Sequence, residues 1–376
     1  MIRRVLHVIP FLWSGAGRVV TRLCEEQARD ADVHIATAGR ANGQTDWAPY
    51  RRRLRRGGIQ WHRLNTFDRS AASLWPTLAE TVDLVRALRP DVIHAHAGVP
   101  TLLSTMAVEA AGSHARVVGQ MYSWGPNRPG WMDTMDLAGF ARADRVVVSA
   151  RRYERTLLDG GVDRRCLVYI PWGVDAPPPR RRIARGRVRR LGFVGRIEPR
   201  KDQVMLVEAF ARARVTMPDT RLVLVGPDGD ASYANEVRHT VERLGLEDVV
   251  DLTGPVRSIW PWLARLDLFV SLSCDEGQGL AVLEAMAAGI PVLAKPAAGL
   301  EDFLVDGVNG LWLRGDGAGT ISTEIVEALS SQARIVRLAL QARRMVARRY
   351  TWPATMRALG RVYGWGNARS ATEQAA

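Results

Sequence analysis

The chain is short of lysine and cysteine. Of its 52 cationic residues only Lys201 and Lys295 are lysines, so the net charge of +13 is carried almost wholly by arginine. An arginine bias of this kind explains the charge without a nucleic-acid partner. The three cysteines, Cys24, Cys166 and Cys274, lie too far apart for a disulfide framework or a zinc motif, which fits a reducing compartment.

Long apolar runs are also missing, since none reaches the ~18–20 residues of a membrane span. Apolar residues make up 47% of the 376-residue chain and charged residues 24%, which excludes wholesale disorder and indicates about two globular domains. The apolar start, Val5–Trp13, superficially resembles a signal peptide. Because His7 interrupts it and the turn-forming residues 14–17 follow, we predict a first strand in a cytoplasmic protein, of bacterial origin given its arginine and alanine content.

Short apolar runs alternate with helical patterns along most of the chain, which predicts an α/β fold with parallel sheets. The first half contains seven predicted strands: Val5–Pro10, Val33–Thr37, Ile59–Leu64, Val92–His94, Arg116–Gln120, Arg145–Ser149 and Leu167–Ile170. The second half contains five: Leu191–Val194, Leu222–Val225, Val249–Leu252, Leu268–Leu272 and Val292–Ala294.

A proline- and arginine-rich stretch interrupts this alternation between the two halves. We therefore predict a first Rossmann-like domain over residues 1–176, a linker over 177–190 and a second Rossmann-like domain over 191–346. Two such domains would face a cleft. Open α/β sheets bind ligands at the carboxyl ends of their strands, so the loops after the strands are the places to search for function.

Two of these loops carry glycines or paired cations. Ser14–Gly17 follows the first strand and suits either a phosphate-binding turn, through Gly15 and Gly17, or a plain connection. Gly195–Lys201 follows the strand that opens the second domain. Arg196 and Lys201 in this loop can hold a diphosphate and stabilise the charge that develops as it leaves.

The stretch from Asp275 to Val292 gives the strongest signal. Glycines open a turn after a strand, so backbone N–H groups at the start of the next helix are free for a ligand. Glu276 precedes this helix and Glu284 lies inside it. Carboxylates bind sugar hydroxyls well because each accepts several hydrogen bonds, so both are candidate sugar contacts.

Two histidines end the strand near residue 92. Alternation places His94 and His96 on the same side, but no acidic residue or cysteine stands at a usable spacing, so we predict no metal site. His96, at the carboxyl end of the strand, is expected to donate a hydrogen bond to substrate. His94 is expected to be a satisfied core group or a group that supports the residues in contact with substrate.

In their order and spacing these loops resemble retaining, nucleotide-sugar-dependent glycosyltransferases of the GT-B fold, the large family marked by an E-x7-E motif. The matching segments also include Ile170–Asp175, Leu252–Val256 and Asp306–Gly310. The resemblance implies two Rossmann-like domains facing a cleft. It also implies that residues 347–376 form a terminal helix that crosses back to the first domain, followed by a tail.

The resemblance further implies residue roles. His96, Arg196, Lys201 and Glu276 would be the catalytic group, with His96 near the donor sugar. The donor-binding set would be Gly15, Gly17, Val256, Gly277, Gln278, Gly279, Leu280 and Glu284, with Glu284 on the ribose and the backbone near Val256 on the base. The family generally needs no metal or other cofactor. The nucleotide-sugar donor is a substrate, and we expect a UDP-sugar ahead of a GDP-sugar.

The sequence departs from the family pattern at positions that face the donor. The opening loop lacks the usual acid, Gln278 replaces an aromatic residue and Trp172 replaces a common asparagine. The identity of the donor sugar therefore stays open. In the implied reaction, the acceptor hydroxyl attacks on the face from which the diphosphate leaves, with retention of configuration.

The acceptor side is less defined. Tyr122, Trp124 and Trp131 offer aromatic faces that suit a small cyclitol- or aminoglycoside-like acceptor or a saccharide. Alternatives are a lipid-linked acceptor, with the basic helix Arg51–Arg56 resting on an anionic membrane, and a pseudo-glycosyltransferase or epimerase on the same fold. We expect no nucleic-acid partner, because no aromatic residues are interleaved among the arginines of Arg51–Arg56 and Arg180–Arg190. The oligomeric state is left open.

Overall fold

The computed structural model describes residues 3–12, 14–38, 48–64, 71–124, 130–177 and 189–365. The chain divides into two compact units: unit 1 comprises Met1–Trp172 and Trp352–Ala376, and unit 2 comprises Gly173–Thr351. The predicted first domain extends four residues past the first division. Most of the predicted linker, 178–188, and the tail from 366 onward lie outside the described residues.

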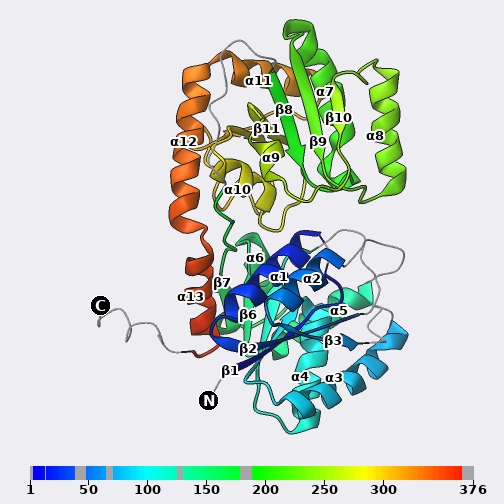
Figure 1. Cartoon of the computed structure of the whole chain (residues 1–376), viewed down its shortest axis with the longest axis vertical. Helices are drawn as coiled ribbons and strands as arrows, with labels where there is room; N and C mark the ends of the chain where they lie inside the picture. Colours follow the sequence, from blue (N-terminus) through cyan, green and yellow to red (C-terminus); the bar gives the residue numbers. More distant parts are fainter. Residues whose placement is uncertain are drawn as a thin grey trace. The chain divides into compact units, whose positions relative to one another are not determined.

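Unit 1 is built on a parallel sheet with the strand order β3-β2-β1-β4-β5-β6-β7 among the described residues (Figure 1). The strands are β1 Arg3–Val8, β2 Ala31–Ala38, β3 Gln60–Leu64, β4 Val92–His96, β5 Arg116–Met121, β6 Arg145–Val148 and β7 Leu167–Tyr169. The helices are α1 Ser14–Gln27, α2 Ala48–Arg56, α3 Leu74–Leu88, α4 Gly98–Ala111, α5 Gly130–Arg142, α6 Arg152–Asp159 and α13 Trp352–Val362. A strand is followed by a helix at nearly every step, as parallel pairing requires.

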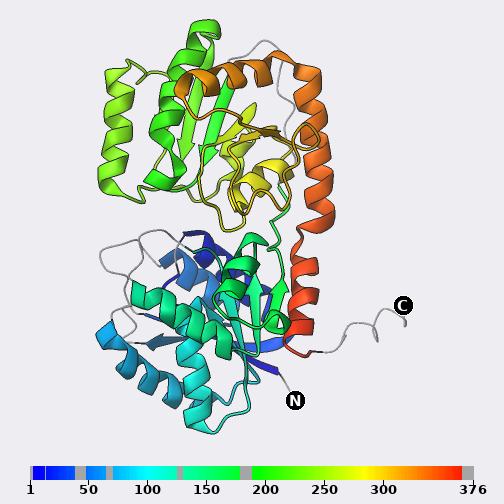
Figure 2. The same ribbon diagram turned by 180° about the vertical axis from the view of Figure 1, so that it is seen from behind.

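Unit 2 repeats this plan with the strand order β10-β9-β8-β11-β12-β13 (Figures 1 and 2). The strands are β8 Arg189–Val194, β9 Thr220–Val225, β10 Val250–Leu252, β11 Leu268–Ser271, β12 Val292–Ala294 and β13 Leu311–Trp312. The helices are α7 Gln203–Thr216, α8 Ala231–Arg243, α9 Trp260–Leu263, α10 Leu280–Ala287, α11 Ala318–Ser330 and α12 Gln332–Arg349. All assigned strand pairs of both sheets are parallel.

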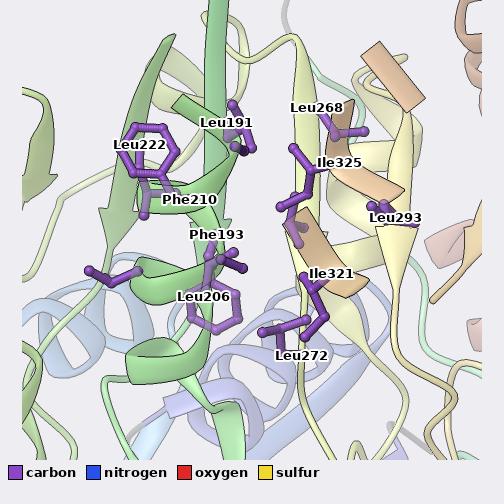
Figure 3. Packing of buried hydrophobic residues seen from close by; sticks show 14 of the residues in the cluster. Leu191, Phe193, Leu206, Phe210, Leu222, Leu268, Leu272, Leu293, Ile321 and Ile325 are labelled. Carbon is purple, nitrogen blue, oxygen red and sulfur yellow. The ribbon is translucent and has the colours of Figure 1, made fainter. Parts of the chain in front are cut away.

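Apolar side chains from several elements of unit 2 form one buried cluster, part of which Figure 3 shows. Phe193 of β8 and Phe210 of α7 lie on one side of this view, and Ile321 and Ile325 of α11 lie on the other side, with Leu268 of β11. Each fully buried side chain of this size contributes about 1.5–3 kcal/mol of stability. The strand ends that carry the polar loops are therefore anchored in a rigid core.

In each sheet the chain reverses its direction of winding once. The reversal lies between β1 and β4 in unit 1 and between β8 and β11 in unit 2. At such a point the loops leaving two adjacent parallel strands diverge to opposite faces and leave room for a ligand at the carboxyl edge. The loops that follow these four strands are therefore the places where a site is expected.

The last described helix, α13, belongs to unit 1 although it follows unit 2 in sequence. Thr355 donates a hydrogen bond to the carbonyl of Pro171 at 2.8 Å, and Arg116 donates to the carbonyl of Val362 at 2.9 Å. None of the helices described for this chain is both long enough and apolar enough to cross a membrane.

The predicted strands are confirmed, with ends that move by one or two residues. The sequence did not predict α4, α5, α6, α9, α11, α12 or the short strand β13. The prediction of a turn at Ser14–Gly17 was wrong, because these residues form the first turn of α1. Gly17 is needed there for close packing, since a Cβ at this position would lie 2.7 Å from the carbonyl carbon of Leu12.

Candidate active site

The reversal point of unit 2 brings together the cations and the acid that the sequence singled out. Lys201 ends the loop after β8, and its ammonium group forms an ion pair with the carboxylate of Glu276 in the loop after β11. Lys201 is 7% exposed. A charge so deeply placed is tolerated only when it is paired, so Glu276 stabilises Lys201.

A second ionic group lies in the same two loops. Glu198 is buried and uses both carboxylate oxygens: Oε2 lies 3.0 Å from Nη2 of Arg196, and Oε1 lies 2.6 Å from Nε of Arg200. Arg200 also donates to the carbonyl oxygen of Asp275 at 3.1 Å. Burial lowers the pKa of Arg196, and the charge of Glu198 opposes this effect. Arg196 therefore stays a guanidinium cation within an ionic network.

The turn between β11 and α10 is shaped by glycine. Gly279 has φ 73°, and a Cβ there would lie 2.1 Å from Cδ2 of Leu300, so only glycine fits. Gly299 donates to the carbonyl of Glu276 at 3.1 Å and fixes the other side of the turn. The predicted amide contacts Gly277 and Leu280 are half-buried.

The side chains of three predicted donor contacts are partly or fully buried. Gln278 is 5% exposed and Glu284, within α10, is 3% exposed. Val256 is half-buried against the second apolar cluster of unit 2 and follows Gly254, whose φ is 64°. The contact of the Val256 backbone with a nucleobase stays a prediction.

In unit 1 the reversal point lies beside His96. Both ring nitrogens of His96 have partners: Tyr122 donates its hydroxyl proton to Nδ1 at 2.8 Å, and Nε2 lies 2.9 Å from Nδ1 of His7. His96 is 2% exposed. The predicted hydrogen bond from His96 to substrate would therefore require one of these partners to be exchanged. Gly15 is exposed at the start of α1, and Gly17 is buried.

The pair of His7 and His96 is part of a longer network of hydrogen bonds. His7 Nε2 lies 2.7 Å from Oε1 of Gln27, and Gln27 Nε2 donates to the hydroxyl of Tyr363 at 2.9 Å. Tyr363 lies 2.7 Å from Nδ1 of His94. Because an amide oxygen only accepts, His7 carries its proton on Nε2, and His96 must then donate from its own Nε2 to His7. Every hydrogen bond of this side-chain network can form while the imidazoles are neutral.

Burial keeps these imidazoles neutral. It lowers the pKa of His7 to about 4 and lowers the pKa values of His94 and His96 well below their ordinary value. Burial also raises the pKa values of Tyr122 and Tyr363, so both remain hydroxyl donors. The expectation that His94 is a satisfied core group is met at Nδ1, which bonds to Tyr363, but not at Nε2, which is buried without a hydrogen-bond partner among the described residues.

His7, His94 and His96 also form a cluster of potential metal ligands in the described part of the chain. His7 and His96 face each other across 2.9 Å with nearly parallel rings, 20° apart. Two nitrogen ligands of one tetrahedral zinc ion lie about 3.3 Å apart and point at the ion rather than at each other. The arrangement is that of a hydrogen bond.

The predicted acceptor residues fall into two groups. Tyr122 is half-buried, bonded to His96 and stacked on Trp172 with ring centroids 6.1 Å apart. Trp124 packs against the apolar cluster around β6, and Trp131 is half-buried in α5. Residues 125–129 between them lie outside the described part of the structure.

Sequence reasoning missed several residues of these networks. Glu198 and Arg200 stood in the loop already singled out, and their alternation of charge was a usable signal. His7 interrupts the apolar run of β1, which was a second signal. Nothing local pointed to Gln27 or Tyr363, since Tyr363 lies 269 residues from the histidine that it contacts.

Comparisons with known proteins agree with this architecture. Residues 13–176 match the model described as Glycosyltransferase Family 4, and residues 188–331 match the model described as Glycosyl transferases group 1. The solved structure of HepE from Anabaena, in complex with UDP and glucose, superimposes with a TM-score of 0.82 at 18% identity and covers 96% of this chain and 99% of that one.

Two curated relatives illustrate the sequence similarity. The chain is 34% identical over 251 residues to the D-inositol 3-phosphate glycosyltransferase of Kineococcus radiotolerans, covering 61% of this chain and 56% of that protein. It is 29% identical over 231 residues to the GDP-mannose-dependent alpha-(1-6)-phosphatidylinositol monomannoside mannosyltransferase of Mycolicibacterium smegmatis, covering 55% and 59%. The matched part therefore spans about half the length of these relatives.

The two parallel-sheet units, together with the likeness to HepE, define a GT-B fold, as predicted from the sequence. The chain belongs to the GT-B glycosyltransferases, and its two halves match the family 4 and group 1 models of that class.

Proposed function

We propose that the chain transfers a sugar from a nucleoside-diphosphate sugar to an acceptor hydroxyl, with retention of anomeric configuration. The observation that carries this proposal is the meeting of Arg196, Lys201 and Glu276 at the reversal point of unit 2. Two cations at the carboxyl edge of a parallel sheet suit a diphosphate, and a carboxylate beside them suits sugar hydroxyls.

In this proposal, binding of the donor gives Lys201 a new ionic partner. The diphosphate takes the place of Glu276 as the partner of Lys201, and the released carboxylate accepts hydrogen bonds from the donor sugar. The amides of Gly277 and Leu280 lie close by, and Glu284 serves the ribose. Gly15, Gly17 and His96 are the proposed substrate contacts of unit 1.

The chemical step needs no carboxylate nucleophile. The bond from the anomeric carbon to the diphosphate oxygen breaks, and the acceptor oxygen bonds to that carbon on the same face. The proton of the acceptor hydroxyl passes to the leaving phosphate oxygen. Arg196 and Lys201 stabilise the charge that grows on the diphosphate in the transition state.

A thermal-shift panel of UDP-, GDP- and ADP-sugars tests the donor. We propose a UDP-sugar first, and the GDP-mannose dependence printed for one relative makes GDP-mannose the main competitor. A donor at 100 times its dissociation constant should add about 2.7 kcal/mol of stability. The absence of a shift with every nucleotide sugar at millimolar concentration would refute the proposal.

The stereochemistry is tested separately, with a donor that the panel identifies and a set of small acceptors. We propose a cyclitol- or aminoglycoside-like molecule or a saccharide, supported by the aromatic faces of Trp124 and Trp131 and by the relative named for D-inositol 3-phosphate. Proton NMR of the product should show the anomeric configuration of the donor. An inverted product would contradict the retaining mechanism, and a pseudo-glycoside or an epimerised sugar would identify a related reaction on the same fold.

A second candidate places the acceptor in a membrane, and one observation favours it. The helix α2 exposes Arg51, Arg52, Arg55 and Arg56 on unit 1. Part of the positive charge of α2 is already paired, because Arg53 donates two hydrogen bonds to Glu25 at 2.8 and 2.7 Å. Co-sedimentation with phosphatidylserine vesicles at 0.15 M salt tests this candidate, and protein that stays in the supernatant would exclude it.

A further inference from the structure

A buried acid in the loop after β8 has no role in the reaction proposed above. Glu198 is 8% exposed and stands directly before the short 3₁₀ turn Pro199–Lys201. Its side chain does not cap that turn. Both of its oxygens instead contact arginines, Arg196 at 3.0 Å and Arg200 at 2.6 Å.

Each arginine leads to a different part of the site. Arg196 is one of the two proposed diphosphate ligands. Arg200 donates to the carbonyl of Asp275, the residue before Glu276, and its own carbonyl accepts from the backbone N–H of Cys274 at 3.0 Å. Glu198 is therefore the shared anchor of a bridge from the diphosphate-binding loop to the loop that carries Glu276.

The backbone around Glu198 leaves its side chain little freedom. The N–H groups of Gly229 and Asp230 both donate to the carbonyl of Ile197, at 2.9 and 3.1 Å. A Cβ on Gly229 would lie 2.9 Å from Cβ of Arg196 and 3.2 Å from Oε2 of Glu198. The loop after β8 therefore packs closely against the segment that contains Gly229, and this glycine leaves space for the ion pair of Glu198 with Arg196.

The charge balance points to the same role. Arg196, Arg200 and Lys201 are three cations in one loop, and their mutual repulsion would turn the guanidinium groups apart. Glu198 supplies a negative charge that contacts both arginines, whereas the carboxylate of Asp275 lies 3.9 Å from Arg200. Charge-assisted contacts of this kind fix the orientation of a guanidinium as well as lowering its energy.

We propose that Glu198 is a positioning residue that holds Arg196 in the orientation that binds the donor diphosphate. This inference rests on the proposed function and adds a residue to it. Glu198 itself touches no substrate. Its effect reaches the ligand through Arg196, and its contact with Arg200 ties the loop of Arg196 to the carbonyl of Asp275.

The two possible effects of removing this carboxylate have opposite signs. If Glu198 were merely a nearby negative charge, Glu198→Gln would raise the local positive charge and tighten the binding of an anion. If it positions Arg196, the same change lets the guanidinium move away and weakens the binding of the diphosphate. The direction in which the diphosphate affinity changes therefore distinguishes a positioning role from that of a nearby charge.

The test measures binding of UDP, GDP and ADP, and of the three corresponding monophosphates, by isothermal titration calorimetry. The ratio of diphosphate to monophosphate affinity isolates the contribution of the second phosphate. We expect Glu198→Gln to weaken the diphosphate about tenfold and to leave the monophosphate within threefold, with unchanged stoichiometry. A purely structural role would lower both affinities, or the stoichiometry, together.

A double-mutant cycle with Arg196→Ala shows whether the effect passes through Arg196. In the Arg196→Ala background, Glu198→Gln should cost nothing further. Asp228→Asn is the matched control, because Asp228 belongs to the adjacent loop and pairs with Arg238 at 2.7 Å on an exposed surface. This variant should keep the wild-type ratio.

The outcomes separate the two levels of the argument. If the wild-type protein binds none of UDP, GDP and ADP, the proposed function fails, and the inference fails with it. If it binds one of them and Glu198→Gln leaves the affinity unchanged or tighter, or if the losses in the cycle add, only the inference is overturned.

Discussion

Mild acid should weaken unit 1 selectively, because its buried histidines are held neutral. Burial lowers the pKa of His7 from 6.5 to about 4. Between these values the unfolded chain binds a proton that the folded chain refuses, so stability is complete above pH 6.5 and falls as the pH falls toward 4. At 1.36 kcal/mol per pKa unit, His7 alone accounts for about 3 kcal/mol over this range. His94 and His96 shift in the same direction.

At pH 5, where most carboxylates are still ionised, the loss from His7 is about 2 kcal/mol. The assay is native-state hydrogen exchange of the amides of β1 and β4 at pH 7.0 and 5.0, corrected for the intrinsic exchange rate. Their protection should fall by at least about 30-fold, the equivalent of 2 kcal/mol. The amides of β8 and β11 serve as the internal control, because these strands contain no histidine.

The substitution His7→Asn removes one of the titrating groups. It should reduce the pH dependence of protection in β1 and β4 by up to about 1.36 kcal/mol per pH unit, the value for one proton. Equal protection of these amides at pH 7.0 and 5.0 in the wild-type protein would refute the reasoning, since it would mean that the folded chain takes up the protons without cost.

Three further predictions concern single side chains. Lys201→Ala should lower turnover by about 2–4 kcal/mol of transition-state stabilisation, whereas Lys295→Ala, which removes the only other lysine, should leave steady-state kinetics near wild type; equal losses in both would argue against a special role for Lys201. Gly279→Ala should destabilise unit 2 by about 2–4 kcal/mol in urea unfolding, because φ is positive there and the new methyl group would meet Leu300; an unchanged midpoint would contradict this. Tyr363→Phe should cost about 1–3 kcal/mol and increase hydrogen exchange in α13, since it leaves two buried groups without a partner, and unaltered exchange would show that the hydroxyl does not hold this helix.

The fold was predictable because its signals are local and repeated. A strand such as Leu268–Ser271 is short and mostly apolar, and the helix after it begins directly after a glycine, Gly279. Helices without a clear apolar stripe were harder to predict. In α4 nearly every residue of the first two turns is buried, so no contrast between faces marks it as a helix.

The candidate site was predictable in part. Arg196, Lys201 and Glu276 follow strands, and a parallel sheet places such loops at one edge whatever the details of packing. Their partners were not predictable. The choice of Glu276 for Lys201, and of Glu198 for Arg196, depends on loop conformations that are fixed by glycines such as Gly229 and Gly279.

The amino-acid sequence alone therefore determined the two α/β halves and the loops in which chemistry is concentrated, because hydrophobic periodicity and strand-end position are properties of neighbouring residues. Only the tertiary structure decided that His96 is bonded at both nitrogens and that Tyr363 closes the chain through Gln27 and His7. Those contacts join residues between 20 and 336 positions apart. No local pattern encodes them, since they arise when separate elements pack into one core.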